Sequence, residues 1–295
     1  MEIMSSLSEL FITGAESFVG KNLIKFCQQY GYPYTGIDLV ASDDPSVSSI
    51  DICSPNLDEV IPHGATVIHL AAISRDSDCL REPVLANRVN IEGSLNVLRC
   101  AKLRSASQFI FASSEWVYGQ VSNQSVQTEN DRLGIDQLDS IYAITKAIGE
   151  RYLFLLRGNL SVTILRFGII YGPRYNNWSA VESLFDAVKR KEEVTVGSLR
   201  AGRRFIHIDD ICLGILASLG RRDYEIFNLS GDATVTLEEI LNESMLILGK
   251  NPKIIETTPG KVSIRNPSNE KARFHLSWFP QIQLPDGLRT LVANN

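Results

Sequence analysis

Two rhythms of hydrophobic and polar positions alternate along the first half of the chain. Short β-branched and aromatic runs, which are typical of buried strands, precede longer stretches with the apolar spacing of amphipathic helices. The predicted strands are residues 10–13, 34–38, 66–71, 108–112 and 162–167, and the predicted helices are residues 18–30, 82–103 and 139–156. This order predicts an α/β fold, a Rossmann-like doubly wound parallel sheet with right-handed crossovers.

The pattern becomes less regular after about residue 170. Pro, Gly and Asn interrupt residues 171–177 and 251–267, and a helix is predicted over residues 236–248. We therefore expect a dinucleotide-binding domain over residues 1–170, with a returning segment near residues 205–230. Residues 171–295 should form a smaller C-terminal substrate-binding lobe.

Composition and charge narrow the class of partner. The chain is 44% hydrophobic and 21% charged, its net charge is −5, and Lys and Arg form no run, which argues against nucleic-acid binding. No apolar run reaches the length of a membrane span, and the first residues lack a basic stretch followed by an apolar one. We expect a cytoplasmic protein without a membrane partner.

The cysteines indicate neither a disulfide framework nor a metal site. The five thiols are scattered and form no Cys-x-x-Cys pair. We expect them to be reduced and mostly buried, with no bound metal; they are Cys27, Cys53, Cys79, Cys100 and Cys212.

A glycine-containing segment lies between the first predicted strand and helix. Gly14 permits a tight turn, Gly20 permits close packing of helix on strand, and the helix start would present N–H groups to a pyrophosphate. Ser17 stands where a second glycine allows the closest phosphate approach, and it fits if its φ is negative. The candidate contacts are Gly14, Ser17, Phe18, Val19 and Gly20; the alternative is an ordinary strand-to-helix turn.

Asp38 ends the second predicted strand at the interval expected for a ribose-binding acid. A carboxylate there accepts hydrogen bonds from the adenosine ribose and repels a 2′-phosphate, which favours NAD over NADP. The alternative is a surface aspartate at a strand end.

Tyr142 and Lys146 lie four residues apart in a predicted helix, so they share one face. A nearby cation is expected to lower the pKa of the phenol and make it a base for a substrate hydroxyl. Ser113 and Ser114 follow an apolar strand, at the sheet edge where such folds bind ligands. Each feature by itself is common in surface helices and strand-end turns.

In their order along the chain, these segments resemble the extended short-chain dehydrogenase/reductase family, specifically its NAD-dependent epimerase/dehydratase group, whose members modify nucleotide sugars. The matching segments are Thr13–Gly20 (TGxxGxxG), Val67–Ala72 (HLAA), Val89–Gly93 (VNxxG), Ser113–Gly119 (SSxxVYG), Tyr142–Lys146 (YxxxK), Arg166–Pro173 (RxxxxYGP), Arg203–Asp210 (RDFIHVDD) and Asn269–Pro280 (KAxxxLGWxP).

The resemblance implies NAD as cofactor and assigns further residues. Ser114 takes the catalytic Ser/Thr place, and Arg203 matches an arginine on the nucleotide diphosphate. Arg265 is a weaker candidate for the same contact, and either arginine could instead be a surface ion-pair partner. Ser113 is a further candidate for substrate contact, and His69 and His207 match structural positions. Additional cofactor contacts are expected at Asp51, Ile52, Leu70, Ala71, Ala72 and Asn90. The helix over residues 139–156 matches one through which members form homodimers.

Departures from the family pattern bear on the reaction. Ile169 stands where many relatives carry a sugar-contacting Asn. Glu115 could protonate a leaving hydroxyl, but Trp116 replaces the second carboxylate of common dehydratases. The leading hypothesis is an NAD-dependent nucleotide-sugar 4-epimerase that works through a transient keto-sugar. The alternatives are a 4-ketoreductase, a dehydratase and a non-catalytic dinucleotide-binding protein, the last disfavoured because both Tyr142 and Lys146 are present.

Overall fold

The computed structural model describes residues 8–119 and 125–292, which divide into two compact units. Within the described residues, the first unit comprises 8–119, 132–166 and 215–227, and the second comprises 125–131, 167–214 and 228–292. The sequence predicted that the first domain ends at residue 170, and in the structure this part of the first unit ends at Arg166. The returning segment was predicted near residues 205–230, and in the structure it is residues 215–227.

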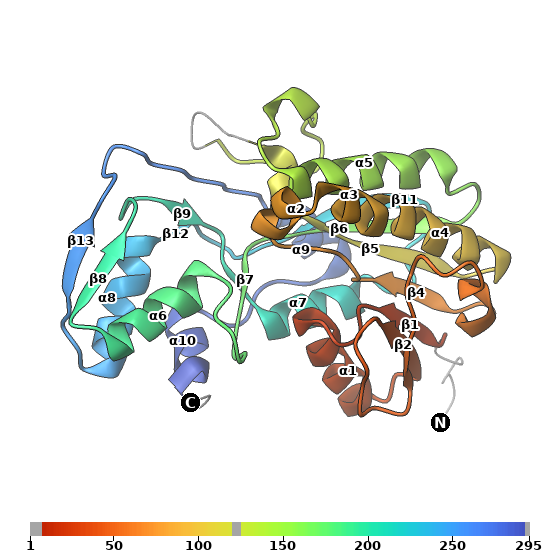
Figure 1. The fold of residues 1–295 in the computed structure, drawn as a ribbon, viewed down its shortest axis with the longest axis horizontal. Coiled ribbons are helices and arrows are strands. Elements are labelled where there is room, and N and C mark those ends of the chain that lie inside the picture. The colour runs from red at the N-terminus through yellow and green to blue at the C-terminus, as the bar shows by residue number, and fades with distance from the viewer. Residues whose placement is uncertain (1–7, 120–124, 293–295) are drawn as a thin grey trace. The chain divides into compact units, whose positions relative to one another are not determined.

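A seven-stranded sheet with the order β11-β6-β5-β4-β1-β2-β3 organises the first unit (Figure 1). Its strands are β1 (Leu10–Thr13), β2 (Tyr34–Asp38), β3 (Val47–Ser49), β4 (Thr66–His69), β5 (Gln108–Ser114), β6 (Ser161–Phe167) and β11 (Tyr224–Leu229). The predicted doubly wound α/β fold is confirmed. Strands β2 and β3 are added on one side of β1 and strand β4 on the other, so the order of strand addition reverses between β1 and β4.

The strand register brings several predicted site residues to one edge of the sheet. Thr13, the last residue of β1, lies beside Ile37 of β2 and His69 of β4, and these pairs are parallel. The residues that follow, Gly14 and Leu70, therefore leave the sheet at the same carboxyl edge as Asp38.

Helices cover both faces of this sheet, with α1 (Phe18–Tyr30) on one face and α4 (Ser94–Leu103) and α5 (Ile141–Leu156) on the other (Figure 1). The apolar side chains of β4 and β5 pack against α4 and α5, and Phe109, Phe111 and Leu153 are at most 1% exposed. This packing fixes α5 over the strand that ends in Ser114. Short 3₁₀ turns cover Leu57–Val60, Glu115–Tyr118 and Ile135–Gln137.

The prediction of one helix over residues 82–103 is wrong. The segment is divided into α3 (Pro83–Asn87), a π-helical turn η2 (Arg88–Gly93) and α4, and a further helix α2 (Asp76–Arg81) precedes it. Glu82 separates α2 from α3 and has φ −128° and ψ 64°. Because Glu82 precedes a proline, helical backbone angles are disfavoured at this position. A Cβ at Gly93 would lie 2.6 Å from Ile52, so this turn packs tightly.

The second unit contains four helices that lie wholly within it and several short strand pairs. They are α6 (Ala180–Arg190), α8 (Leu237–Leu248), α9 (Glu270–Leu276) and α10 (Leu284–Val292), with strands β7 (Ile170–Tyr171), β8 (Glu193–Val196), β9 (Gly202–Arg203), β10 (Ile206–His207), β12 (Val235–Thr236) and β13 (Lys253–Glu256). Apolar side chains of α6, α8 and α10 form its core. Helix α7 (Ile208–Ala217) carries the chain from this unit into the first.

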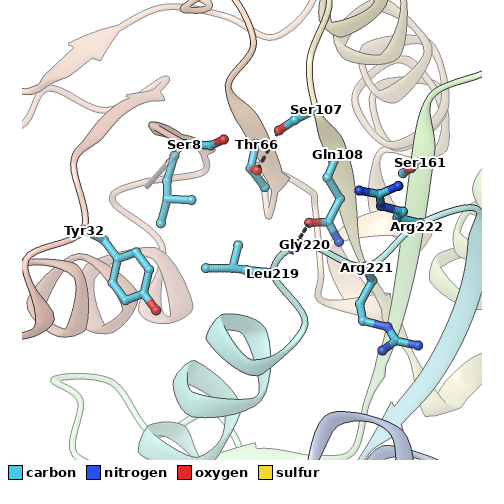
Figure 2. A pocket seen from close by; sticks show the side chains of 11 residues that line it. Ser8, Tyr32, Thr66, Ser107, Gln108, Ser161, Leu219, Gly220, Arg221 and Arg222 are labelled. Atoms are coloured by element: carbon cyan, nitrogen blue, oxygen red, sulfur yellow. Dashed lines mark hydrogen bonds between the residues drawn. The ribbon is translucent and has the colours of Figure 1, made fainter. Parts of the chain in front are cut away.

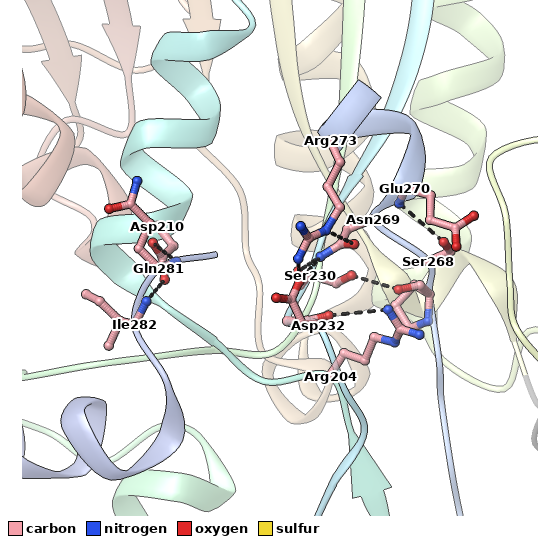
Figure 3. A network of polar contacts seen from close by, with 12 residues as sticks. Arg204, Asp210, Ser230, Asp232, Ser268, Asn269, Glu270, Arg273, Gln281 and Ile282 are labelled. Atoms are coloured by element: carbon pink, nitrogen blue, oxygen red, sulfur yellow. Dashed lines mark hydrogen bonds and ion pairs between the residues drawn. The ribbon is translucent and has the colours of Figure 1, made fainter. Parts of the chain in front are cut away.

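Polar contacts anchor the last segment of the second unit (Figure 3). The carboxylate of Asp210 accepts hydrogen bonds from the amides of Gln281 and Ile282, and its carbonyl accepts one from Trp278 Nε1. Asn269 donates to Asp232, which also pairs with Arg273. Two of the family-like segments, 203–210 and 269–280, thus meet in structural contacts.

The burial of the cysteines agrees with the expectation. All five thiols are free, four are buried, and Cys53 is partly exposed. Among the described residues, no group of His, Cys, Asp or Glu is arranged to hold a metal ion, and no helix is long and apolar enough to cross a membrane.

Candidate active site

The turn after β1 has the geometry expected of a phosphate-binding turn. Gly14 has φ 72°, and a Cβ there would lie 2.7 Å from the Ala71 amide nitrogen, so the turn touches the segment after β4. A Cβ at Gly20 would lie 2.2 Å from the Gly14 carbonyl oxygen. Only glycine fits either position, and the backbone of the turn is therefore drawn close to the start of α1.

Ser17 occupies the helix N-cap with φ −65° and ψ 165°, and its hydroxyl accepts a hydrogen bond from the Gly20 amide. The negative φ required of a serine at this position is present. Phe18 and Val19 follow in the first turn of α1, where helical amides point out of the helix toward its N-terminal end. This donor set suits the pyrophosphate of a dinucleotide.

Asp38 lies beside this turn and is tied to it. Its Oδ2 accepts a hydrogen bond from the Glu16 amide at 2.9 Å, and its Oδ1 accepts one from the Val40 amide at 3.0 Å. A carboxylate offers about four acceptor positions. The remaining positions suit the hydroxyls of a ribose, so the residues present fit a dinucleotide.

The segment Leu70–Ala72 is partly exposed at the same edge, and Asn90 holds the residue that follows it. The Asn90 side chain accepts from the Ile73 amide, donates to the Ile73 carbonyl and donates to Thr145 Oγ1. It is 1% exposed. The structure thus uses Asn90 to place neighbouring backbone, whereas the sequence predicted a direct cofactor contact.

Asp51 and Ile52 divide between surface and core. Asp51 is exposed and caps the Cys53 amide, while the Ile52 side chain is buried against Gly93. Any contact of Ile52 with a cofactor would therefore use its backbone.

The Ser114 side chain acts on the Tyr142 phenol and lowers its pKa, so the start of α5 lies beside the end of β5. Lys146 is 3% exposed, its Nζ donates to the Ala112 carbonyl at 2.8 Å, and it lies 5.8 Å from the centroid of the Tyr142 ring. The structure places these three residues together at the carboxyl end of β5. They form a group able to exchange a proton with a substrate oxygen.

The expected lowering of the Tyr142 pKa by Lys146 is wrong. Burial raises the pKa of Tyr142 to about 12, and the interaction with the Ser114 side chain is the main effect opposing that rise. Burial also lowers the pKa of Lys146 to about 8, because desolvation penalises its charge. The ammonium is thus itself costly to maintain beside the phenol.

Two neighbours of Ser114 are oriented away from solvent. The Ser113 hydroxyl donates to Glu150 Oε1 at 2.5 Å and is 2% exposed, so its side chain is committed to the interior rather than presented to a substrate. Glu115 is fully buried at the start of the 3₁₀ turn after β5. Burial disfavours a role for Glu115 as an acid that meets substrate directly.

Arg203 and Arg265 approach each other within the second unit. The Gly202 carbonyl accepts from both the Arg203 guanidinium, at 2.6 Å, and the Arg265 amide, at 3.3 Å. Arg203 also donates to the Ser263 carbonyl and hydroxyl. The alternative that Arg265 is a surface ion-pair partner does not hold, since Arg265 is 6% exposed.

The histidines have the structural character expected of them. His69 is completely buried between Thr13 Oγ1 and Ser94 Oγ, and burial lowers its pKa to about 3. His207 is 2% exposed and contacts Thr290. Burial lowers its pKa as well.

Sequence reasoning missed Asp76 and the ion pair of Glu150 with Arg166. Asp76 Oδ1 accepts from Ser140 Oγ at 2.6 Å and from the Tyr142 amide, which caps the start of α5. No local pattern links Asp76 to a helix so far along the chain. Glu150, however, follows Lys146 by four residues, and that spacing alone places it on the same helix face.

A cavity of about 620 Å³ lies at the opposite, amino edge of the sheet (Figure 2). It is lined by the first residues of four strands, Leu10, Thr66, Gln108 and Ser161. The Gln108 amide is already engaged, since it donates to Thr163 and the Ser218 carbonyl and accepts from the Gly220 amide. The cavity contains none of the predicted site residues.

Comparison with known proteins gives a family match that includes the segments described above. The model of the NAD dependent epimerase/dehydratase family matches residues 10–230. The chain is 26% identical to UDP-glucuronate 4-epimerase of Thermodesulfobacterium geofontis, over 95% of this chain and 94% of that protein. It is 24% identical to UDP-N-acetyl-alpha-D-glucosaminuronate decarboxylase of Bacillus cytotoxicus, over 95% of each.

Among solved structures, UDP-glucose 4-epimerase of Thermotoga maritima with UDP-glucose superposes with a TM-score of 0.86 at 25% identity. The superposition covers 97% of this chain and 98% of that one. The likeness thus extends over both units.

Proposed function

We propose that this chain, which belongs to the NAD dependent epimerase/dehydratase family, is a nucleotide-sugar 4-epimerase. Membership of the family makes it an NAD-dependent enzyme. The observation that carries the finer proposal is the group formed by Tyr142, Ser114 and Lys146 at the carboxyl end of β5. The names of similar proteins, which include 4-epimerases for UDP-glucuronate and UDP-glucose, support the same reading.

Each residue of the group has a distinct task in this proposal. Tyr142 takes the proton of the sugar 4-hydroxyl as the C4 hydrogen leaves as hydride, and it later returns that proton to the keto oxygen. Ser114 donates a hydrogen bond to the reacting oxygen, and Lys146 holds the Ala112 carbonyl beside it. NAD, when bound, supplies the acceptor and then the donor of the hydride.

The parts of the site suit NAD in a definite arrangement. The turn from Gly14 to Gly20 would hold the pyrophosphate, Asp38 the adenosine ribose, and Lys146 the nicotinamide ribose. Arg203 and Arg265 are proposed to bind the diphosphate of the sugar nucleotide, since guanidinium groups pair well with phosphate oxygens.

Residues beside Ser114 favour epimerisation over dehydration. Dehydration needs an acid and a base for water loss, but Glu115 is fully buried and Trp116 carries no carboxylate. A decarboxylase for uronic acids would begin from the same keto-sugar, so identification of the product has to separate the two.

The test is a panel of UDP-, dTDP-, GDP- and CDP-sugars incubated with purified protein and no added reductant. UDP-glucuronic acid and UDP-glucose come first because relatives are named for them. An epimer of unchanged mass supports the proposal, and loss of carbon dioxide or water assigns the other reactions. Turnover only with added NADH would assign a ketoreductase.

We further propose that the protein is a homodimer that uses α5. Apolar side chains on α2, α3 and α5 are exposed, among them Leu80 at 68%, Val84 at 82% and Leu155 at 56%. Sedimentation of Leu155→Glu should give a monomer. Leu246→Glu, which changes an exposed leucine on α8, should leave the dimer intact.

A further inference from the structure

Glu150 and Arg166 form a buried ion pair directly behind the catalytic group. Arg166 Nε and Nη2 donate to the two carboxylate oxygens of Glu150 at 3.0 and 2.7 Å, and the two side chains are 3% and 5% exposed for Arg166 and Glu150. Arg166 Nη1 also donates to the Tyr118 hydroxyl. A buried pair of this kind is weak evidence for stability, because desolvation offsets its attraction. The location of the Glu150–Arg166 pair beside the catalytic group therefore needs an explanation other than stability.

Glu150 also reaches the end of β5. Its Oε1 accepts the Ser113 hydroxyl at 2.5 Å, and Ser113 precedes Ser114. Consecutive residues of the strand are thus held by residues spaced four apart on α5. Lys146 holds the Ala112 carbonyl, Glu150 holds Ser113, and Tyr142 contacts Ser114.

The charge of Glu150 lies one helical turn from Lys146. It favours the protonated amine and opposes the desolvation that lowers the Lys146 pKa. The other titratable groups near Lys146 are Tyr142 on the same helix, Cys79 on α2 and His69 on β4. Glu150 is the carboxylate among these neighbours.

We propose that Glu150, oriented by Arg166, is a positioning residue that acts on the catalytic group through the Ser113 hydroxyl and through its place one turn from Lys146. The proposal rests on the proposed function for its effect on turnover. Its effect on Lys146 can be measured without any substrate.

Two variants separate contact from charge. Ser113→Ala removes the hydroxyl and leaves the ion pair intact, whereas Glu150→Gln removes the charge. Because Glu150→Gln leaves the Arg166 cation without its counterion, circular dichroism and bound NAD per chain normalise every rate to folded protein. Ser218→Ala is the matched control, since it removes an equally buried hydroxyl at the opposite end of the sheet.

The first readout is the titration of Lys146, followed by NMR on protein labelled with ¹³C-lysine and assigned with Lys146→Met. Glu150→Gln should move the Lys146 midpoint down by about 1 pH unit, the low end for a neighbouring charge. Glu150→Asp should restore most of the shift. A midpoint unchanged in Glu150→Gln would overturn the proposal, whether or not the protein turns over a sugar nucleotide.

The second readout is turnover of the sugar nucleotide identified by the panel. Ser113→Ala should lower kcat by about 10-fold with KM little changed, because misplacement of reacting groups is costly to the rate. Ser218→Ala should keep the wild-type kcat. Equal kcat in Ser113→Ala and wild type would overturn the positioning role, and absence of turnover in wild type would instead count against the proposed function.

Discussion

The side chain of Asn90 donates a hydrogen bond to Thr145 Oγ1 at 3.1 Å, and this contact joins the π-helical turn η2 to the helix that carries Tyr142. Thr145 in turn donates to the Tyr142 carbonyl. Because Asn90 also grips both backbone groups of Ile73, it sets the separation between the segment after β4 and α5. Asn90, in the family-like VNxxG segment, thus positions the backbone around the site without facing it.

Replacing Asn90 with Ala should therefore destabilise the protein strongly. The substitution leaves the partly buried Ile73 amide and carbonyl without their partner, for which we expect a loss of about 3 kcal/mol in the free energy of unfolding. Urea denaturation measures this value. Asn87→Ala, which removes an exposed hydrogen bond within α3, should cost less than about 0.5 kcal/mol. Equal losses of stability in both variants would show that the Asn90 hydrogen bonds do not hold these segments together.

Gly14 and Gly64 offer a matched test of the phosphate turn. Both have left-handed φ, 72° and 74°, but a Cβ at Gly64 meets nothing within 4 Å, whereas one at Gly14 collides with Ala71. Gly64→Ala should cost about 1 kcal/mol through backbone strain alone. Gly14→Ala should cost a further 1–3 kcal/mol or so and weaken NAD binding. Isothermal titration and thermal melts measure both, and wild-type NAD affinity in Gly14→Ala would contradict the assignment of the turn.

Asp38 should set the choice between NAD and NADP. Asp38→Asn removes the charge that favours ribose hydroxyls and repels a 2′-phosphate, so the Kd for NAD should rise about 10-fold or more. The preference for NAD over NADP should shrink at the same time. Fluorescence titration with both dinucleotides gives the ratio, and a ratio that does not change would rule out contact with the ribose.

His69 should make the protein sensitive to acid. Its pKa is about 3 in the folded protein, against the ordinary value of 6.5, so the unfolded chain binds the extra proton between these pH values. Stability is therefore unaffected above pH 6.5 and falls as pH is lowered below it. The cost at pH 5 is about 2 kcal/mol, from the 1.36 kcal/mol per pKa unit.

The control for this effect is His69→Gln, which removes the titrating ring. Denaturation at pH 7 and pH 5 should show a smaller loss in the variant than in wild type. A variant that loses as much stability as wild type over this interval would show that the acid sensitivity has another origin.

Local patterns in the sequence predicted much of the sheet. Strands β1 and β2 and helix α1 have the predicted bounds, because glycine, aspartate and apolar periodicity are local signals. The order of Tyr142, Lys146 and Ser114 along the chain was also sufficient to place them together, since strand ends in such a sheet meet at one edge.

Other features depend on contacts that are distant in the sequence. At η2, Gly93 packs tightly against Ile52, and the structural use of Asn90 follows from its contact with Ile73. Burial, likewise, cannot be read from spacing. The spacing of Tyr142 and Lys146 predicted a lowered phenol pKa, but burial raises the pKa of Tyr142 to about 12.

Transfer of the C4 hydrogen within one active site is the central claim, and isotope retention tests it most directly. UDP-glucuronic acid carrying deuterium at C4, or the sugar nucleotide that the panel identifies, is incubated with the enzyme and no added reductant, and the product is analysed by mass spectrometry and NMR. We predict a C4 epimer that keeps the deuterium at C4, and no such product from Tyr142→Phe. Loss of the deuterium from the product, or equal turnover by Tyr142→Phe, would contradict the account.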